Sequence, residues 1–251
     1  MKATTIARLL VVAFCVGLLE LLCRTGQMPR LVIIPPSEMF IAMIGLLRQP
    51  QILDSLAFTV MVVAVSGVMS VVMGVLIGIV IHATPRLREV VEPVLSAYYA
   101  IPNFIFYPLF IVVFGLGAPS LIALAVLFAI GAMVIATIDG LDSIPPIYRR
   151  VASVFQIGYR KELWHIRLPA AAPYLLTGMK LVVVYAFIAV IAGEFLLSNK
   201  GVGHEIAFAY NNFDNASMYG LILLVILLIL LINALLRLVR APGSRGTELA
   251  R

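Results

Sequence analysis

Charged residues are scarce in this chain of 251 residues. Only 12% are charged, about half of the roughly 25% typical of soluble domains, whereas 63% are hydrophobic. The mean hydropathy is +1.10. A soluble domain of this size keeps much of its surface in water and could not bury so many apolar side chains. The composition excludes a soluble enzyme and a disordered chain, and it indicates an integral membrane protein built of helices.

Cysteine and the common catalytic motifs are also nearly absent. Cys15 and Cys23 are the only cysteines; on one helix they would lie about 12 Å apart, too far for a disulfide. No G-x-x-x-x-G-K-[S/T], H-E-x-x-H or G-x-S-x-G motif occurs. We therefore expect neither enzymatic activity nor ATP hydrolysis by this chain. We also expect no metal site, because the three histidines lie in three different connections.

The apolar residues form six runs that can cross a bilayer, for which about 20 residues are needed. The predicted spans are residues 6–22, 56–81, 95–114, 120–138, 174–197 and 218–239. Pro102 and Pro108 interrupt the third span. The first run resembles a signal peptide, but it carries Glu20 and has no small-x-small cleavage site, so we expect it to be retained.

Two local patterns lie in and before the second span. Pro35-Pro36-Ser37, followed by apolar residues at helical spacing, predicts a short helix at the membrane surface with Ser37 as its N-cap. A small residue then recurs at every fourth position of the second span, at Ser66, Ser70, Gly74 and Gly78. Such a stripe lets another helix approach closely, and that helix can belong to the same chain or to a second copy.

The basic residues predict the orientation, because cytoplasmic loops carry an excess of Lys and Arg. One side collects 13 of them, and the other collects 4. The 13 are Lys2, Arg8, Arg86, Arg88, Arg149, Arg150, Arg160, Lys161, Arg167, Arg237, Arg240, Arg245 and Arg251. Both termini, the tail 241–251 and the loop 139–173 are therefore predicted to be cytoplasmic.

The loop 139–173 is long for a connection, which indicates that it has its own structure and a function. We expect one short helix from Pro145-Pro146 to about Ile157 and a second over residues 159–166, ended by Pro169. Two short helices at the membrane surface can form a docking surface. The alternative is an amphipathic loop that lies on anionic lipid.

The residues of this loop resemble the "EAA" loop of ABC-importer permeases, whose pattern is E-A-A-x3-G-x9-I-x-L-P. Ile166, Leu168 and Pro169 match the second half of the pattern. Counting back from Ile166 places the family's glycine at Gln156 and its glutamate at Arg150. Its two alanines fall at Val151 and Ala152, and Gly158 lies two residues after the glycine position.

Further segments resemble the nitrate/sulfonate/taurine branch of these permeases, in the same order over about 200 residues. They are residues 34–37, the connection 78–93, Ala100-Ile101-Pro102-Asn103 with Pro108-Leu109 and residues 114–117, Thr177-Gly178-Met179-Lys180, Ala192-Gly193-Glu194 and Gly201-Val202-Gly203. The resemblance implies a type I ABC-importer permease, an all-α membrane protein of about six spans in the bacterial cytoplasmic (inner) membrane.

The resemblance also implies partners. Such permeases form a dimer around one pathway, here expected to be a homodimer in membrane lipid, with no nucleic acid. Two ATP-binding subunits hold the ATP and magnesium, and this chain holds no cofactor. A soluble or lipid-anchored binding protein delivers a small solute, such as nitrate, a sulfonate, taurine or a vitamin precursor. The residues expected to couple to the ATPase are Arg150, Val151, Ala152, Ser153, Gln156, Gly158, Ile166, Leu168 and Pro169, with residues 151–157 as the coupling helix.

Candidate pathway residues follow from polar and helix-breaking positions inside the spans. Pro102 and Pro108, with Asn103 and Tyr107 between them, indicate that the third span lines a pathway or is only kinked. Glu194 is an ionisable group in the fifth span, and it either faces the pathway or caps the turn at Gly201. An ATP-independent channel or secondary transporter subunit is the alternative function, although such proteins usually carry more intramembrane charge.

Overall fold

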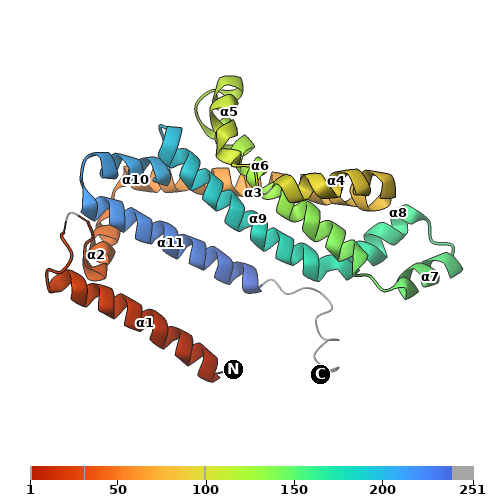
Figure 1. The fold of residues 1–251 in the computed structure, drawn as a ribbon, viewed down its shortest axis with the longest axis horizontal. Coiled ribbons are helices and arrows are strands. Elements are labelled where there is room, and N and C mark those ends of the chain that lie inside the picture. Colours follow the sequence, from red (N-terminus) through yellow and green to blue (C-terminus); the bar gives the residue numbers. More distant parts are fainter. Residues whose placement is uncertain (1, 31, 99, 239–251) are drawn as a thin grey trace. The chain divides into compact units, whose positions relative to one another are not determined.

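The computed structural model describes the backbone of residues 2–30, 32–98 and 100–238, and this part of the chain is helical with no strand (Figure 1). The predicted all-α class is confirmed. The helices are α1 (Lys2–Arg24), α2 (Pro36–Leu46), α3 (Pro50–Ala83), α4 (Pro85–Tyr98), the 3-10 helix η1 (Asn103–Phe106), α5 (Tyr107–Phe114), α6 (Ala118–Asp142), α7 (Pro146–Val154), α8 (Tyr159–Glu162), the π-helical turn η2 (Leu163–Arg167), α9 (Leu168–Leu197), α10 (Val202–Asn211) and α11 (Asn215–Leu238).

Four stretches of the described chain are long and apolar enough to cross a membrane. They are Pro50–Ala83, Ala118–Asp142, Tyr159–Leu197 and Asn215–Leu236. The predicted spans 56–81, 120–138 and 174–197 lie within the first three stretches, and 6–22 lies within α1. The number of spans stays a prediction.

The predicted third span, 95–114, is not one helix. Residues 100–102 are not helical, and Pro102 has a ψ of 87°. A proline has no N–H to continue a helix and disfavours helical geometry at the residue before it. Pro108 does not interrupt a helix, because it lies in the first turn of α5. Backbone N–H groups in a first turn have no partner within the helix, so a proline there costs no helical hydrogen bond.

Two expectations about the loop 139–173 also need correction. The first loop helix, α7, ends at Val154 and not near Ile157. Pro169 does not end the second helix, since it lies in the first turn of α9, and η2 joins α8 to α9. The helical stretch Tyr159–Leu197 continues past Pro169, with the π-helical turn η2 directly before α9.

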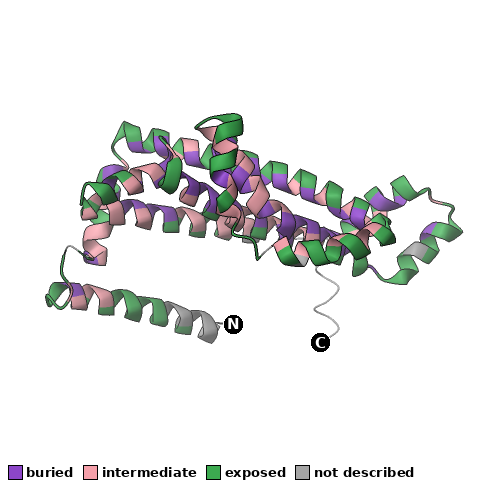
Figure 2. Ribbon diagram, turned by 45° about the horizontal axis from the view of Figure 1, so that its top comes forward, coloured by how far each residue is buried: buried purple, intermediate pink, exposed green. Residues whose placement is uncertain are grey.

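The chain divides into two compact units, and each is described by itself. Unit 1 comprises residues 1–59 and 194–230, and unit 2 comprises residues 60–193 and 231–251. In unit 1, exposed side chains dominate the described part of α1 (Figure 2). The predicted tail 241–251 lies outside the described residues.

In unit 2, glycines allow α3 and α9 to pack closely on α6. A Cβ atom added to Gly74 would lie 2.5 Å from the Cβ of Met133, and one added to Gly78 would lie 2.6 Å from that of Thr137. From α9, a Cβ on Gly178 would lie 2.5 Å from the Cβ of Ala136. The two glycines of the small-residue stripe, Gly74 and Gly78, therefore meet another helix of the same chain.

In unit 1, Glu194 holds the turn between α9 and α10. Its side chain is fully buried, and its carboxylate accepts hydrogen bonds from the hydroxyl of Thr59 and the backbone N–H of Gly203, each at 2.9 Å. The Thr59 hydroxyl in turn accepts the N–H of Val202 at 2.9 Å. A Cβ on Gly201, whose φ is +106°, would overlap with the Glu194 carboxylate. The two motifs Ala192-Gly193-Glu194 and Gly201-Val202-Gly203 thus form one interlocked structure.

A second carboxylate orders the start of α2. Ser37 is not the N-cap of this helix, because Pro35 occupies that position and makes no side-chain capping bond. The carboxylate of Glu20 on α1 instead accepts the backbone N–H of Ser37 at 3.0 Å and its hydroxyl at 2.7 Å. An acidic group from another helix therefore satisfies one of the free N–H groups of the first turn.

We predict that Gly201→Ala destabilises the protein by more than about 2 kcal/mol, because the new methyl group collides with the buried carboxylate in addition to straining the backbone. Gly26→Ala is the matched control. Gly26 also has a positive φ, +75°, but a Cβ there meets nothing within 4 Å. Thermal unfolding in detergent measures both variants, and equal losses would contradict the interlocked turn.

In unit 2, we predict that Gly78→Leu separates α3 from α6 and lowers stability by about 1–3 kcal/mol through overpacking. Gly67→Leu on the same helix is the control, since a Cβ at Gly67 meets nothing within 4 Å. The unfolding temperature in detergent should fall for the first variant and stay near the wild-type value for the second. A tolerated Gly78→Leu would show that α3 does not pack on α6 through this stripe.

Candidate functional site

The candidate site is the segment between α6 and α9, which presents apolar side chains to its surroundings. Exposure reaches 75% for Val154 and 73% for Phe155, and Ile147, Tyr148 and Val151 are also exposed. Ala152 is buried at 1% exposure. Helix α7 is short and begins after Pro145, with Pro146 in its first turn. Its exposed apolar face is the kind of surface that marks a protein or membrane contact.

The residue that follows the C-cap of α7 has left-handed backbone geometry. Gln156 has a φ of 51°, and its N–H bonds to the carbonyl of Ser153 at 3.1 Å. The N–H of Ile157 bonds back to the carbonyl of Ala152 at 2.9 Å. Glycine is the usual residue at such a helix end, because it reaches this geometry without steric cost. The structure therefore explains why the motif's glycine falls at position 156, whereas Gly158, with a φ of −61°, needs no glycine.

A buried ion pair, which the sequence interpretation missed, stiffens the second half of the loop. Arg167 at the end of η2 binds Glu162 through Nη2 at 2.7 Å and through Nε at 2.8 Å. Both side chains are at most 13% exposed, and the guanidinium lies over the ring of Tyr159 at 5.4 Å. The five-residue spacing of the pair is unusual for an α-helix, and the wider π turn accommodates it. No sequence rule for α-helices would pair these two residues.

Together the two halves border an open hollow of about 580 Å³. It is lined by Ile147, Tyr148, Val151, His165, Ile166, Pro169 and Ala170. Three of the predicted coupling residues, Val151, Ile166 and Pro169, thus lie together at this hollow. Arg150, Ser153, Gln156 and Gly158 are exposed elsewhere on the loop, whereas Ala152 and Leu168 face its interior.

The candidate pathway residues separate into exposed and buried sets. Pro102 and Pro108 are exposed and Asn103 is half-buried. Tyr107 is buried at 1% exposure, and in unit 2 its ring packs near Gly193. Glu194 caps the Gly201 turn in unit 1, which was one of the two roles considered for it. A role in lining a pathway stays a prediction for all five.

An ionic cluster lies in unit 2, where α6 ends and the loop begins. Arg88 on α4 binds both carboxylate oxygens of Asp142, Nη1 to Oδ1 at 3.1 Å and Nη2 to Oδ2 at 2.8 Å. His82 Nε2 lies 3.3 Å from Oδ1 of the same residue. The pKa of the Arg88 guanidinium is raised, chiefly by the hydrogen bond and charge of Asp142, with smaller contributions from Glu92 and Asp139.

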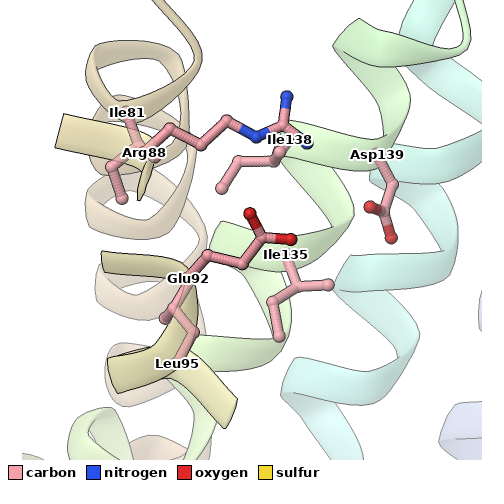
Figure 3. A pocket seen from close by; sticks show the side chains of 7 residues that line it. All are labelled: Ile81, Arg88, Glu92, Leu95, Ile135, Ile138 and Asp139. Atoms are coloured by element: carbon pink, nitrogen blue, oxygen red, sulfur yellow. The ribbon is translucent and has the colours of Figure 1, made fainter. Parts of the chain in front are cut away.

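Beside this cluster is a hollow of about 280 Å³. Figure 3 shows Arg88 and Glu92 reaching from α4 toward α6, on which Asp139 lies. The other lining residues, Ile81, Leu95, Ile135 and Ile138, are apolar. The residues of this cluster are far apart in the sequence, so no local motif predicts it. The one available signal was that these charged residues lie near helix ends on the same predicted side of the membrane.

Solved structures with the same fold include chains of the MetNI methionine ABC transporter in inward-facing conformations. One, in the CY5 native crystal form, has a TM-score of 0.67 at 18% identity and covers 76% of this chain and 96% of that chain. Another, from a selenomethionine soak, has a TM-score of 0.61 at 20% identity and covers 72% and 93%. At these identities the likeness establishes only that this chain shares the fold of those chains.

Proteins with related sequences point the same way. The nitrate import permease protein NrtB of Leptolyngbya laminosa is 29% identical over 173 residues, which are 69% of this chain and 62% of that protein. The taurine transport system permease protein TauC of Escherichia coli K12 is 24% identical over 211 residues, 82% of this chain and 74% of that protein. A probable ABC transporter permease protein of Haemophilus influenzae is 24% identical over 90% of this chain and 91% of its own length. The match thus spans less than two thirds of the nitrate permease.

The family described as binding-protein-dependent transport system inner membrane component matches residues 70–241. This range includes α6, the whole loop with its left-handed position at Gln156, and α9. The chain therefore belongs to this family of inner-membrane transport components.

Proposed function

We propose that the chain is the membrane-spanning subunit of an ATP-driven ABC importer. The observation that carries the proposal is the family match over residues 70–241, which contains an exposed apolar helix, α7, between two long apolar helices. In this proposal two copies form a homodimer in the lipid bilayer around one pathway. Two separate subunits bind ATP and magnesium and hydrolyse the ATP, and a binding protein delivers the solute from outside. The excess of basic residues in the connections supports a cytoplasmic position for both termini in this proposal.

Helix α7 and the hollow behind it are the proposed docking site for the ATPase. Val154 and Phe155 are its most exposed apolar residues, and each apolar side chain that becomes buried is worth about 1.5–3 kcal/mol. Val151, Ile166 and Pro169 line the hollow, where a partner side chain can insert. Arg150 and Ser153 contribute polar contacts at the rim. Gln156, Gly158 and buried Ala152 and Leu168 set the shape of the loop.

In this proposal the loop also transmits the movement of α7 to α9. The second half of the loop is suited to this role because it is rigid. Residues 159–197 continue through α8, η2 and α9, and the Glu162–Arg167 pair lies at the junction. A force on α7 would therefore act on α9 through a stiff connection. Closure of the two ATPases would bring the two copies of α7 together and switch access to the pathway from one side of the membrane to the other.

For the pathway itself, we propose the broken region before α5. Pro102 frees backbone groups that protein or a water-lined cavity has to satisfy, and Pro102, Asn103 and Pro108 reach the surface. Tyr107 and Glu194 would support the pathway wall from within the chain. The proposed solute is small and polar, like the nitrate and taurine in the names of the relatives, and the binding protein would select it.

The proposed docking predicts that Phe155→Ser weakens binding of the ATPase subunit at least roughly tenfold, because an apolar side chain leaves the interface. Phe213→Ser is the matched control, since Phe213 is 82% exposed but lies in unit 1, after α10. Co-purification of the ATPase with each variant, followed by ATP-dependent uptake in proteoliposomes, measures the effect. If the wild-type chain retains no ATPase and drives no ATP-dependent uptake, the proposed function is wrong.

The left-handed position predicts that Gln156→Val loosens the loop, because a β-branched residue is strained there by about 1–2 kcal/mol. Gln156→Gly should be tolerated, and so should Gly158→Val, since Gly158 has ordinary geometry and open space around it. The rate of tryptic cleavage at Arg160 and Lys161 measures local opening. It should rise several-fold for Gln156→Val alone, and equal rates for the two valine variants would contradict this geometry.

A further inference from the structure

One aspartate, Asp142, links α4 to the end of α6, from which the loop 143–167 continues. We call this loop the coupling loop. Asp142 is the last residue of α6, so the loop starts directly after it. Its carboxylate holds Arg88 through two bonds and lies near His82, at the corner where α3 ends and α4 begins. The Arg88 and Asp142 side chains are 38% and 37% exposed. An ion pair this exposed contributes little to stability, so it can be broken at small cost.

A second carboxylate lies one helical turn away on α6. Asp139 precedes Asp142 by three residues, which places both on the same side of the helix about 4.5 Å apart along its axis. Asp139 makes no side-chain hydrogen bond or ion pair within the described part of the chain. It shares the 280 Å³ hollow with Arg88 and Glu92 (Figure 3). The guanidinium therefore has an alternative partner and space through which to reach it.

We propose that Arg88 exchanges Asp142 for Asp139 when the coupling loop moves, so that α4 and α6 shift by about one turn between two discrete positions. The proposal rests on the proposed function, which supplies the movement of α7. Packed helices move in such steps because their interfaces are bistable, not continuously deformable. His82 stays beside Asp142 and can bind its carboxylate after Arg88 has left, while Glu92, on α4, moves together with Arg88.

The exchange would carry the loop's movement to the proposed pathway. Helix α4 continues toward the break at Pro102, the region whose exposed residues are assigned to the pathway above. A one-turn shift of α4 therefore displaces one end of that break, whereas the other end is attached to η1 and α5. Asp142 and Asp139 act in this scheme as positioning residues, since neither contacts the solute or the ATP.

The first test uses the complete complex with its ATPase and binding protein, reconstituted in lipid. Asp139→Asn should leave ATPase docking and basal ATP hydrolysis unchanged and lower uptake roughly three- to tenfold, the size of typical coupling effects. Asp139→Glu keeps the carboxylate and should restore uptake. Glu89→Gln is the matched control: it removes a carboxylate from α4 at an exposed residue with no side-chain bond in the described chain, and it should behave as wild type.

The second test measures the shift itself. Spin labels at Val90→Cys on α4 and Ser143→Cys at the end of α6, with Cys15 and Cys23 replaced by alanine, report the distance between the helices. Trapping the nucleotide-bound state should change this distance by about 4–5 Å in the wild-type background and should not change it in Asp139→Asn.

Three outcomes would overturn the exchange: normal uptake in Asp139→Asn, a full loss in Asp139→Glu, or a distance change that persists in Asp139→Asn. Failure of the proposed function would look different. In that case the wild-type complex itself would show no ATP-dependent uptake, before any variant is compared.

Discussion

A membrane interior has no water to bind a free backbone N–H or carbonyl group, and this constraint shapes the chain. Long uninterrupted helices satisfy it internally, and every break needs a partner from elsewhere in the protein. The turn between α9 and α10 shows how this is done. Thr59 and Glu194 accept the N–H groups of Val202 and Gly203, at the start of a helix where such groups have no partner of their own. Gly201 is needed because only a residue without a side chain fits against the carboxylate.

The same constraint explains why small residues decide the packing of unit 2. Between helices in lipid there is little hydrophobic gain, so close contact supplies much of the stabilisation. Gly74, Gly78 and Gly178 bring α3 and α9 onto α6 until a single added methyl group would overlap with a neighbour. This group of three helices is a firm base from which the loop between α6 and α9 projects.

The loop differs from the closely packed helices, because it exposes apolar side chains where a protein surface usually presents polar ones. Val154 and Phe155 stand out from α7, while Ala152 and the Glu162–Arg167 pair keep the loop in one conformation. A surface that is both apolar and rigid is suited to binding a partner and to passing on its movement. The base of the loop packs through the buried side chain of Ile144 in a cluster with Leu141, Leu163 and Leu168. Beside this cluster, Asp142 forms a half-exposed ion pair with Arg88.

The sequence by itself determined the membrane class, the long apolar helices, the position of the loop and the family, because these depend on composition, on run length and on the order of short motifs. It also located Gln156 as the motif's glycine position, although it could not say why a glycine belongs there. Only the tertiary structure decided that the third predicted span is broken at Pro102 but not at Pro108. It also decided that Ser37 is not a cap, that Glu194 meets Gly201, and that Asp142 binds Arg88. The contacts of Glu20 with Ser37, of Glu194 with Gly201 and of Asp142 with Arg88 depend on which distant groups the fold brings within bonding distance. Arg88 and Asp142, for example, are 54 residues apart in the sequence. Helical periodicity carries no information about contacts over such a separation.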